Sequence, residues 1–258
     1  PINPMSKRFI LIMLLAVCTL PTLAQEKAKK PAAQQPPAFP MRHYVEPKNV
    51  KHPPISDYFT PAMATPMTPD AQGFIRRWLL LEPFKKPNRS NTVFVESYLR
   101  EHLKPEQYPG VDAGLPRDGQ KVTVKTAEGK QRVTWHAMDS KNYNVRLFRF
   151  ASGLNKTKYG VLFWGVTVVN APEDMRDVRL AAGSNGASRW WLNGEEVLLL
   201  DGDRRMVVDD GMSRRINLKK GPNILRVGLI NGPGLSDLCV RFLDAKGNPI
   251  TNLTITTE

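Results

Sequence analysis

Two short segments of the sequence carry the residue types that nucleophilic catalysis requires. Ser184 stands among glycines in Gly183-Ser184-Asn185-Gly186, and His136 stands three positions before Asp139. A serine hydrolase typically places its nucleophile in a G-x-S-x-G turn between a strand and a helix, and that pattern does not occur here. Close neighbours along the chain, such as His136 and Asp139, do not make a triad. We therefore predict no catalytic residue, with Ser184 in a turn and His136 near the end of a strand.

Carboxylates gather at one place in the second half of the chain. Asp201, Asp203 and Asp209 offer the hard oxygen ligands that Ca²⁺ prefers, in sequence typical of loops. Arg204 and Arg205 stand beside them and would pair with the same carboxylates. The four histidines are widely spaced, which disfavours a zinc site. The sequence predicts no required cofactor and leaves open either a structural calcium or a solvated turn with ion pairs.

Sugar binding asks for less than catalysis: an aromatic ring for the C–H face of the sugar and polar groups for its hydroxyls. Trp191 is the candidate platform, and interior packing is the alternative for it. Glu195 and Glu196 are adjacent on an expected strand and point to opposite faces, so they are not a facing carboxylate pair of a glycosidase. The polar candidates are Arg189, Asp203, Arg204, Arg205, Asn231 and Asp237.

A predicted hairpin positions these candidates. Asn193-Gly194 lies between two apolar runs and suits a two-residue type I′ turn, which needs positive φ at both positions. Pairing across this turn sets Leu192 against Glu195, Trp191 against Glu196 and Trp190 against Val197. Because side chains alternate along a strand, one face is expected to hold Trp190, Leu192 and Val197, and the other Trp191, Leu198 and Leu200.

The rest of the chain predicts an all-β fold, an antiparallel β-sandwich with one or two short helices. A helix is expected at 90–103, capped by Ser90 or Asn91, because Val95, Leu99 and Leu103 recur every four residues. The segment 159–170 is apolar on both faces and should be a central, covered strand. Further strands are expected at 73–81, 120–125, 130–136, 178–182, 214–218, 223–230 and 238–244.

The N-terminal part of the sequence predicts export. Residues 1–24 have the basic, apolar and small-residue regions of a signal peptide, with cleavage near Ala24. Val17 before Cys18 disfavours a lipoprotein, and no later apolar run is long enough to span a membrane. We expect a secreted, periplasmic or cell-surface protein of a Gram-negative bacterium, with Cys239 left as a buried, unpaired thiol.

A linker and one domain are expected after the signal peptide. Residues 25–69 are rich in proline and predict an extended tail before a domain at 70–258. Four apolar residues of this tail have the character to dock on the domain: Tyr58, Phe59, Met63 and Met67.

The net charge of +13 bears on the choice of partner. The basic residues are scattered in short pairs, and no nucleic-acid motif accompanies them. We therefore expect a basic solvated surface and no nucleic-acid partner, while an anionic glycan or a charged cell surface stays compatible with the charge.

Two segments of this sequence resemble a known family. GSNGASRWWLNGEEV at 183–197 and LKKGPNILRV at 218–227 resemble the late strands of galactose-binding-like β-sandwiches, the PA14-like and glycosidase-associated sugar-binding domains. RWLLLEPF at 77–84 resembles their W-L-x-x-G-P-F opening, with Glu82 in place of the usual glycine. The resemblance spans roughly residues 73–253. It implies a jelly-roll sandwich that binds a polysaccharide or glycan at the loops of one end, in some members with a structural calcium.

Three classes of function are compatible with these observations. The first is a secreted, non-catalytic carbohydrate-binding or accessory module linked to polysaccharide degradation. The second is a carbohydrate esterase or part of one, because SDYFTPAMATPMTPDAQGFIRRWLLLEPF at 56–84 is similar to secreted polysaccharide-degradation proteins labelled acetylxylan esterase. The third is an envelope module that binds another protein, which the proline-rich tether and the basic surface fit equally well.

Overall fold

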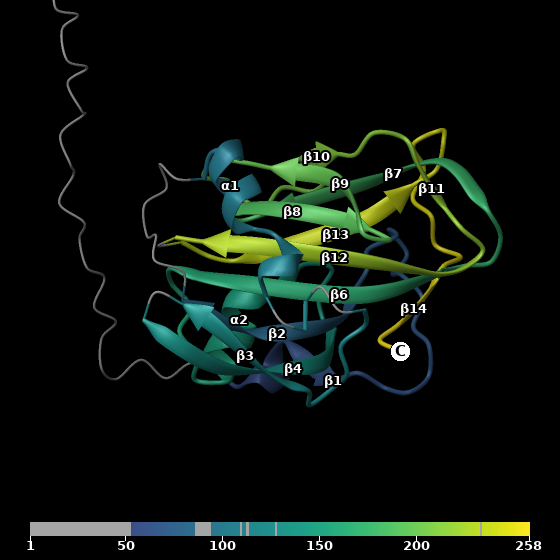
Figure 1. Ribbon diagram of the computed structural model, residues 1–258. Helices are drawn as coiled ribbons and strands as arrows, with labels where there is room; N and C mark the ends of the chain where they lie inside the picture. The colour runs from purple at the N-terminus through teal and green to yellow at the C-terminus, as the bar shows by residue number, and fades with distance from the viewer. Residues whose placement is uncertain (1–52, 86–93, 109, 112–113, 127, 233) are drawn as a thin grey trace, which may run out of the picture. The chain divides into compact units, whose positions relative to one another are not determined.

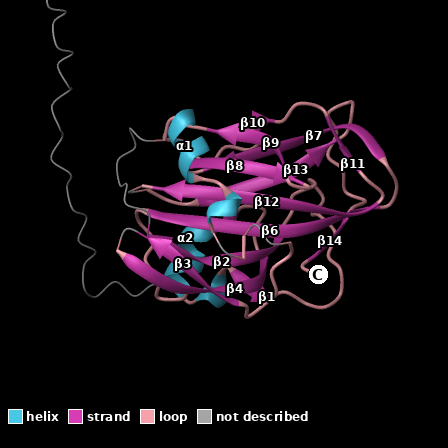
Figure 2. Ribbon diagram, in the orientation of Figure 1, coloured by secondary structure: helices cyan, strands magenta, loops and turns pink. Residues whose placement is uncertain are grey.

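The computed structural model describes residues 53–85, 94–108, 110–111, 114–126, 128–232 and 234–258. These residues form two antiparallel β-sheets with two short α-helices, which confirms the predicted all-β sandwich (Figures 1 and 2). In this part of the chain no helix has the length and apolar character needed to cross a bilayer. The predicted signal peptide, the predicted tail up to residue 52 and the predicted cap at Ser90 or Asn91 lie outside the described residues.

The larger sheet contains nine of the described strands, all paired antiparallel. Its main path runs β1-β4-β2-β6-β12-β8-β9, while β14 pairs with β6 and β3 pairs with β4. β6 lies between β2 and β12, which confirms the prediction of a central, covered strand. In chain order the strands are β1 (Phe59–Pro61), β2 (Arg77–Lys85), β3 (Lys121–Thr126), β4 (Gly129–Ser140), β6 (Val161–Ala171), β8 (Ala187–Leu192), β9 (Glu195–Leu200), β12 (Gly221–Asn231) and β14 (Thr254–Thr256).

The smaller sheet has five described strands, in the order β10-β7-β13-β5 with β11 also on β7. Cys239 on β13 is fully buried, as predicted, and burial raises the pKa of its thiol to about 11. The strands are β5 (Val145–Arg146), β7 (Met175–Ser184), β10 (Gly211–Met212), β11 (Ile216–Leu218) and β13 (Asp237–Leu243).

The helices are α1 (Glu96–His102) and α2 (Leu147–Gly153), with single 3₁₀ turns at Ile55–Asp57 and Pro105–Gln107. The predicted helix at 90–103 is therefore shorter among the described residues: it begins after Val95, whose side chain is exposed. Leu99 and Leu103 are buried, as their spacing predicted. The sequence reading missed α2, in which Leu147, Phe150 and Ala151 face the interior at the spacing of one helix face.

Two apolar clusters lie on opposite faces of the nine-stranded sheet. In β2, Trp78 and Leu80 pack in the cluster that the two sheets share, while Leu79 and Leu81 pack in a second cluster. This second cluster is closed by α1, by the segment 103–111 and by β3. Successive side chains alternate between the two clusters from Trp78 to Leu81 in β2 and from Val161 to Trp164 in β6, so these stretches are apolar at every position.

The hairpin of β8 and β9 has the predicted turn, but its strand pairing differs from the prediction beyond Trp191. Asn193 and Gly194 have φ of 52° and 86°, and the pairs Leu192–Glu195 and Trp191–Glu196 are in the predicted register. A β-bulge follows, so that Trp190 pairs with Leu198 and not with Val197. The extra residue puts Leu198 on the face of Trp190, where Val197 also lies. The prediction that Leu198 shares the face of Trp191 is therefore wrong.

The folded part extends further toward the N-terminus than the predicted boundary at residue 70. β1 pairs with β4, setting Phe59 against Ser140, and Met67 pairs with Ile255. Phe59 is 2% exposed and packs in the shared cluster, whereas Met63 is 67% exposed. Residues 55–69 thus belong to the sandwich. Their strand residues pair with residues far away in the sequence, and such pairings cannot be predicted from the local sequence.

The hairpin turn leads to a first prediction. We expect Gly194→Ala to lower the free energy of unfolding by about 1 kcal/mol, because an L-residue is disfavoured at positive φ. No atom lies within 4 Å of the added Cβ, so the backbone conformation alone is responsible. The control is Gly234→Ala, at an equally open glycine without positive φ, which should change stability little. Urea denaturation measures the free energy of unfolding of both variants. Equal values for Gly194→Ala and Gly234→Ala would contradict the type I′ turn.

Candidate functional site

Trp191, the predicted sugar platform, lies inside the protein. Its side chain is 6% exposed, with the Trp164 ring 5.7 Å away, centroid to centroid. The Arg189 guanidinium carbon lies 5.0 Å from the Trp191 ring centroid. The structure therefore places this ring among protein side chains, as the packing alternative expects.

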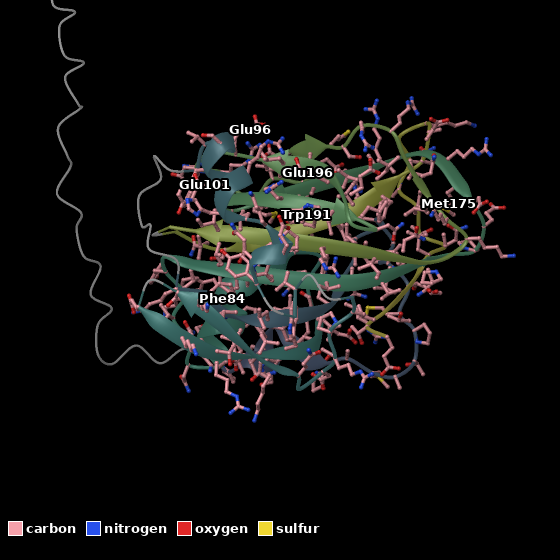
Figure 3. All side chains as sticks on the ribbon, viewed as in Figure 1. Phe84, Glu96, Glu101, Met175, Trp191 and Glu196 are labelled. Atoms are coloured by element: carbon pink, nitrogen blue, oxygen red, sulfur yellow. The ribbon has the colours of Figure 1, made fainter. Side chains whose placement is uncertain are left out.

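Arg189 and Glu196 join the hairpin to α1. Glu196 is labelled beside this helix in Figure 3. Arg189 Nη1 donates to the carbonyls of Leu99 and Leu103 at the end of the helix, and its guanidinium also bonds Glu196. Arg100 on α1 donates to the same carboxylate at 2.8 Å. Burial alone would raise the pKa of Glu196, but hydrogen bonds from Arg189 and Arg100 hold it below its usual value. Arg189 thus satisfies carbonyls at the end of the helix and fixes α1 to the hairpin.

The two candidates for nucleophilic catalysis do not meet. Ser184 is fully buried and bonds Ser188 Oγ and the Gly186 carbonyl. His136 lies on β4 with its Nε2 3.3 Å from a carboxylate oxygen of Glu82. Asp139 is held by two bonds from Arg77, at 2.7 and 2.8 Å. Each group is committed to a structural partner, so these residues do not form a triad.

The loops that carry the polar candidates do come together, through the β7–β8 turn. The backbone N–H of Asn185 donates to the Asp237 carbonyl at 2.8 Å, and its side chain donates to the Arg204 carbonyl at 3.5 Å. Asn231 is buried and holds the carbonyls of Lys158 and Gly234. The Arg204 guanidinium bonds Asp210 and the Asp201 carbonyl. Asp203 and Arg205 are exposed on this loop.

Asp237 is the predicted ligand residue whose carboxyl group has a raised pKa. Burial raises the pKa of its carboxyl group to about 6, against a smaller lowering effect of Arg146 and Arg149. Asn144 donates to it at 3.4 Å, and Arg146 is its cross-strand neighbour. The carboxylate is therefore partly covered by its own sheet.

Of the three predicted calcium ligands, Asp209 has its carboxylate bound to an arginine. Both carboxylate oxygens of Asp209 accept from Arg241, and Asp210 accepts from Arg204. Within the described ranges, no three His, Cys, Asp or Glu side chains converge as a metal site. The structure therefore does not gather Asp201, Asp203 and Asp209 around one point, and calcium binding stays a prediction.

A cleft that the sequence reading missed lies near the β1 edge of the larger sheet. It has a volume of about 770 Å³ and is lined by residues 62–64, Arg77, 115–118, Ala137 and 256–258. Pockets for small ligands have volumes of roughly 300 to 1,000 Å³. The lining comes from five separate stretches of the chain, none of which carries a recognisable motif.

Both apolar and polar side chains line this cleft. Met63, Leu115 and Ala137 supply apolar surface. Asp118 accepts from the Ala137 N–H at 2.8 Å, so this wall is fixed to β4. Arg117 is exposed, and its guanidinium makes no hydrogen bond or ion pair with the described residues. A polar ligand in the cleft would meet Arg117 as an available donor.

Comparison with known proteins gives only distant similarities. No family model and no curated protein matches the chain. The chain is similar to a PA14 sugar-binding domain from an RTX adhesin, with 11% identity and a TM-score of 0.39, covering 70% of this chain and 95% of that one.

Two glycosidases are also similar over a part of their length. For a β-glucosidase from Kluyveromyces marxianus the identity is 18% and the TM-score 0.32, covering 43% of this chain and 14% of that one. For a GH31 α-xylosidase from Xanthomonas citri the values are 12% and 0.28, covering 55% and 17%. This chain thus spans a small part of either enzyme, and no site residue is transferred from these proteins.

The Asp237 carboxyl group leads to a second prediction. Its folded pKa of about 6 exceeds the ordinary value of 3.8, so its contribution to stability is full below pH 3.8 and is lost as the pH rises through 6. We expect the loss to reach about 2 to 3 kcal/mol. Asp237→Asn should remove it, so that the variant gains stability relative to the wild type between pH 4 and pH 7 in urea denaturation.

A matched control has the opposite sign. Hydrogen bonds from Asn248 lower the pKa of Asp244, so this group loses its contribution as the pH falls. Asp244→Asn should therefore be less stable than the wild type above pH 3.8, and this difference should shrink as the pH is lowered below 3.8. If both variants follow the wild type at every pH, the assigned environment of Asp237 is wrong.

Proposed function

We propose that this chain is a non-catalytic carbohydrate-binding or accessory module that serves polysaccharide degradation. The observation that carries the proposal is the cleft of about 770 Å³ at the β1 edge, with apolar surface and an available guanidinium. Sugars need both kinds of contact, because their C–H faces are apolar and their hydroxyls need partners. The proposal includes export by the signal peptide at 1–24 and a secreted, periplasmic or cell-surface location.

The chemistry of the lining sets the expected mode of binding. Among the described residues no aromatic ring lines this cleft, so affinity depends on hydrogen bonds from Arg117 and on contacts with Met63 and Leu115. Arg77 lines the cleft too, but its guanidinium is bound to Asp139 and to the Thr65 carbonyl and holds the wall in place. Arg117 is therefore the residue on which ligand affinity should depend.

One observation favours the alternative of a protein partner. Val207, Val208 and Met212 are 53%, 39% and 45% exposed within the segment 207–212. Apolar side chains gathered at one place on a surface often mark a site of protein contact. An envelope protein as the partner is therefore the second candidate. The esterase alternative has no comparable support, because Ser184 and His136 are committed to other partners.

The third prediction tests the cleft by migration in affinity gels that contain xylan, pectin or mannan. We expect one of these polysaccharides to retard the wild-type chain, and Arg117→Ala to weaken the apparent affinity about tenfold, since a charge-assisted hydrogen bond is lost.

The control is Arg132→Ala, which removes the same charge from an exposed position of β4 outside the cleft. It should migrate as the wild type does in each gel. If no polysaccharide retards the wild type, or if Arg117→Ala and Arg132→Ala have the same effect or none, the cleft is not a glycan site. The protein partner then becomes the better candidate for this part of the surface.

A further inference from the structure

A second recess lies at the opposite edge of the nine-stranded sheet. It is a groove of about 390 Å³ between the Asn193-Gly194 end of the β8–β9 hairpin and β11 of the smaller sheet. Leu192, Val197 and Ile216 line it, and their side chains are 5%, 8% and 7% exposed. They form an apolar floor, because all three also pack in the cluster between the sheets.

The rim of this groove is basic. Arg214, Arg215 and Lys219 line it against a single carboxylate, that of Glu195. Arg214 pairs with Glu195 at 2.7 Å, and both side chains are more than half exposed. The two remaining cations therefore face the groove without a carboxylate of its lining to neutralise them.

Arg215 and Lys219 make few side-chain interactions with the described residues. Arg215 uses one nitrogen, Nη1, on the Asp177 carbonyl at 3.2 Å, and its other guanidinium N–H groups make no bond with the described residues. The Lys219 ammonium group likewise makes no hydrogen bond or ion pair there. Asp177 is exposed on the neighbouring strand and meets this region through backbone groups, since its N–H donates to Asn217. Both cations are available to an incoming anion.

The walls of the groove are fixed before any ligand arrives. Asn223 is fully buried and accepts from the Lys219 N–H and from the Asn193 side chain, at 3.1 and 3.0 Å. Asn193 accepts in turn from the Ile224 N–H at 2.8 Å. These bonds tie the hairpin turn to the turn that carries Lys219, so the apolar floor and the cations keep their spacing.

We propose that this groove binds a saccharide that carries a carboxylate, such as a uronate unit of an acidic polysaccharide. The guanidinium of Arg215 offers paired N–H donors that fit the two carboxylate oxygens, and Lys219 adds a second positive charge. The floor of Leu192, Val197 and Ile216 meets the C–H face of the sugar ring. The inference rests on the proposed function in taking the ligand to be a saccharide, and it assigns this site independently of the cleft.

The test is calorimetric titration of the full chain with oligogalacturonate. Three ligands are compared: oligogalacturonate, its methyl ester, which keeps the sugar and loses the charge, and polyglutamate, which keeps the carboxylate and loses the sugar. We expect only oligogalacturonate to bind measurably, and its affinity should fall as salt is added.

Two double variants with equal loss of charge locate the site. Arg215→Ala with Lys219→Ala should weaken oligogalacturonate binding at least about tenfold, since two charge-assisted contacts are lost. Lys130→Ala with Arg132→Ala, at exposed positions of β4, should leave the affinity unchanged. If the first variant does not fold, the single change Lys219→Glu replaces it, because that side chain is exposed and unpaired.

Each contrary result overturns the proposal. Equal binding of the methyl ester removes the role of the carboxylate, and equal binding of polyglutamate removes the role of the sugar. Equal weakening in the two double variants reduces the effect to net charge. Failure of the cleft is recognised separately, because Arg117→Ala then leaves every polysaccharide unaffected while oligogalacturonate still depends on Arg215 and Lys219.

Discussion

The nine-stranded sheet is buried on both faces, and this constraint governs the rest of the structure. One face packs on the smaller sheet, and the other packs under α1, the segment 103–111 and β3. Trp78 and Trp190 lie in the first cluster, Trp135 and Trp164 in the second, and each is at most 1% exposed. Burying a large apolar side chain contributes roughly 1.5 to 3 kcal/mol. Cys239 is the free cysteine in the described part, so burial takes the role that disulfides have in many exported domains.

A sheet covered on both sides allows polar groups inside only where they are paired. Arg77 and Asp139 are 3% and 6% exposed and bind each other through two hydrogen bonds. Arg189 is 8% exposed and is shared between Glu196 and the end of α1. Such groups resemble site residues in the sequence, because charged side chains beside tryptophans are also what a sugar site contains. Arg189 holds α1 onto the sheet, and the Arg77–Asp139 pair links the neighbouring strands β2 and β4.

Local patterns were enough to predict the parts of the fold that depend on neighbours in the sequence. The Asn193-Gly194 turn, the covered strand β6 and the hairpin of β3 and β4 follow from residue types within a few positions. The bulge beside Trp190 could not be predicted in this way. The sequence of the two strands is compatible with pairing both with and without an extra residue, and packing against the two apolar clusters determines the position of the bulge. β1 and β14 are three residues each, and their partners lie far away in the sequence.

The same distinction explains why the sequence did not reveal the cleft or the groove. Arg117 meets Met63 and residues 256–258 only after the sheet has formed, and Lys219 meets Val197 only when the hairpin is tied to the turn at Asn223. Both faces of the larger sheet are occupied, so the recesses lie at its two edges, near β1 and near β9. Edges are lined by turns, whose side chains are not constrained by a core. At the two proposed sites the ligand is therefore selected by the charge of the turns. The basic excess of the chain can act at a rim such as that of Arg215 and Lys219 without disturbing the packing beneath it.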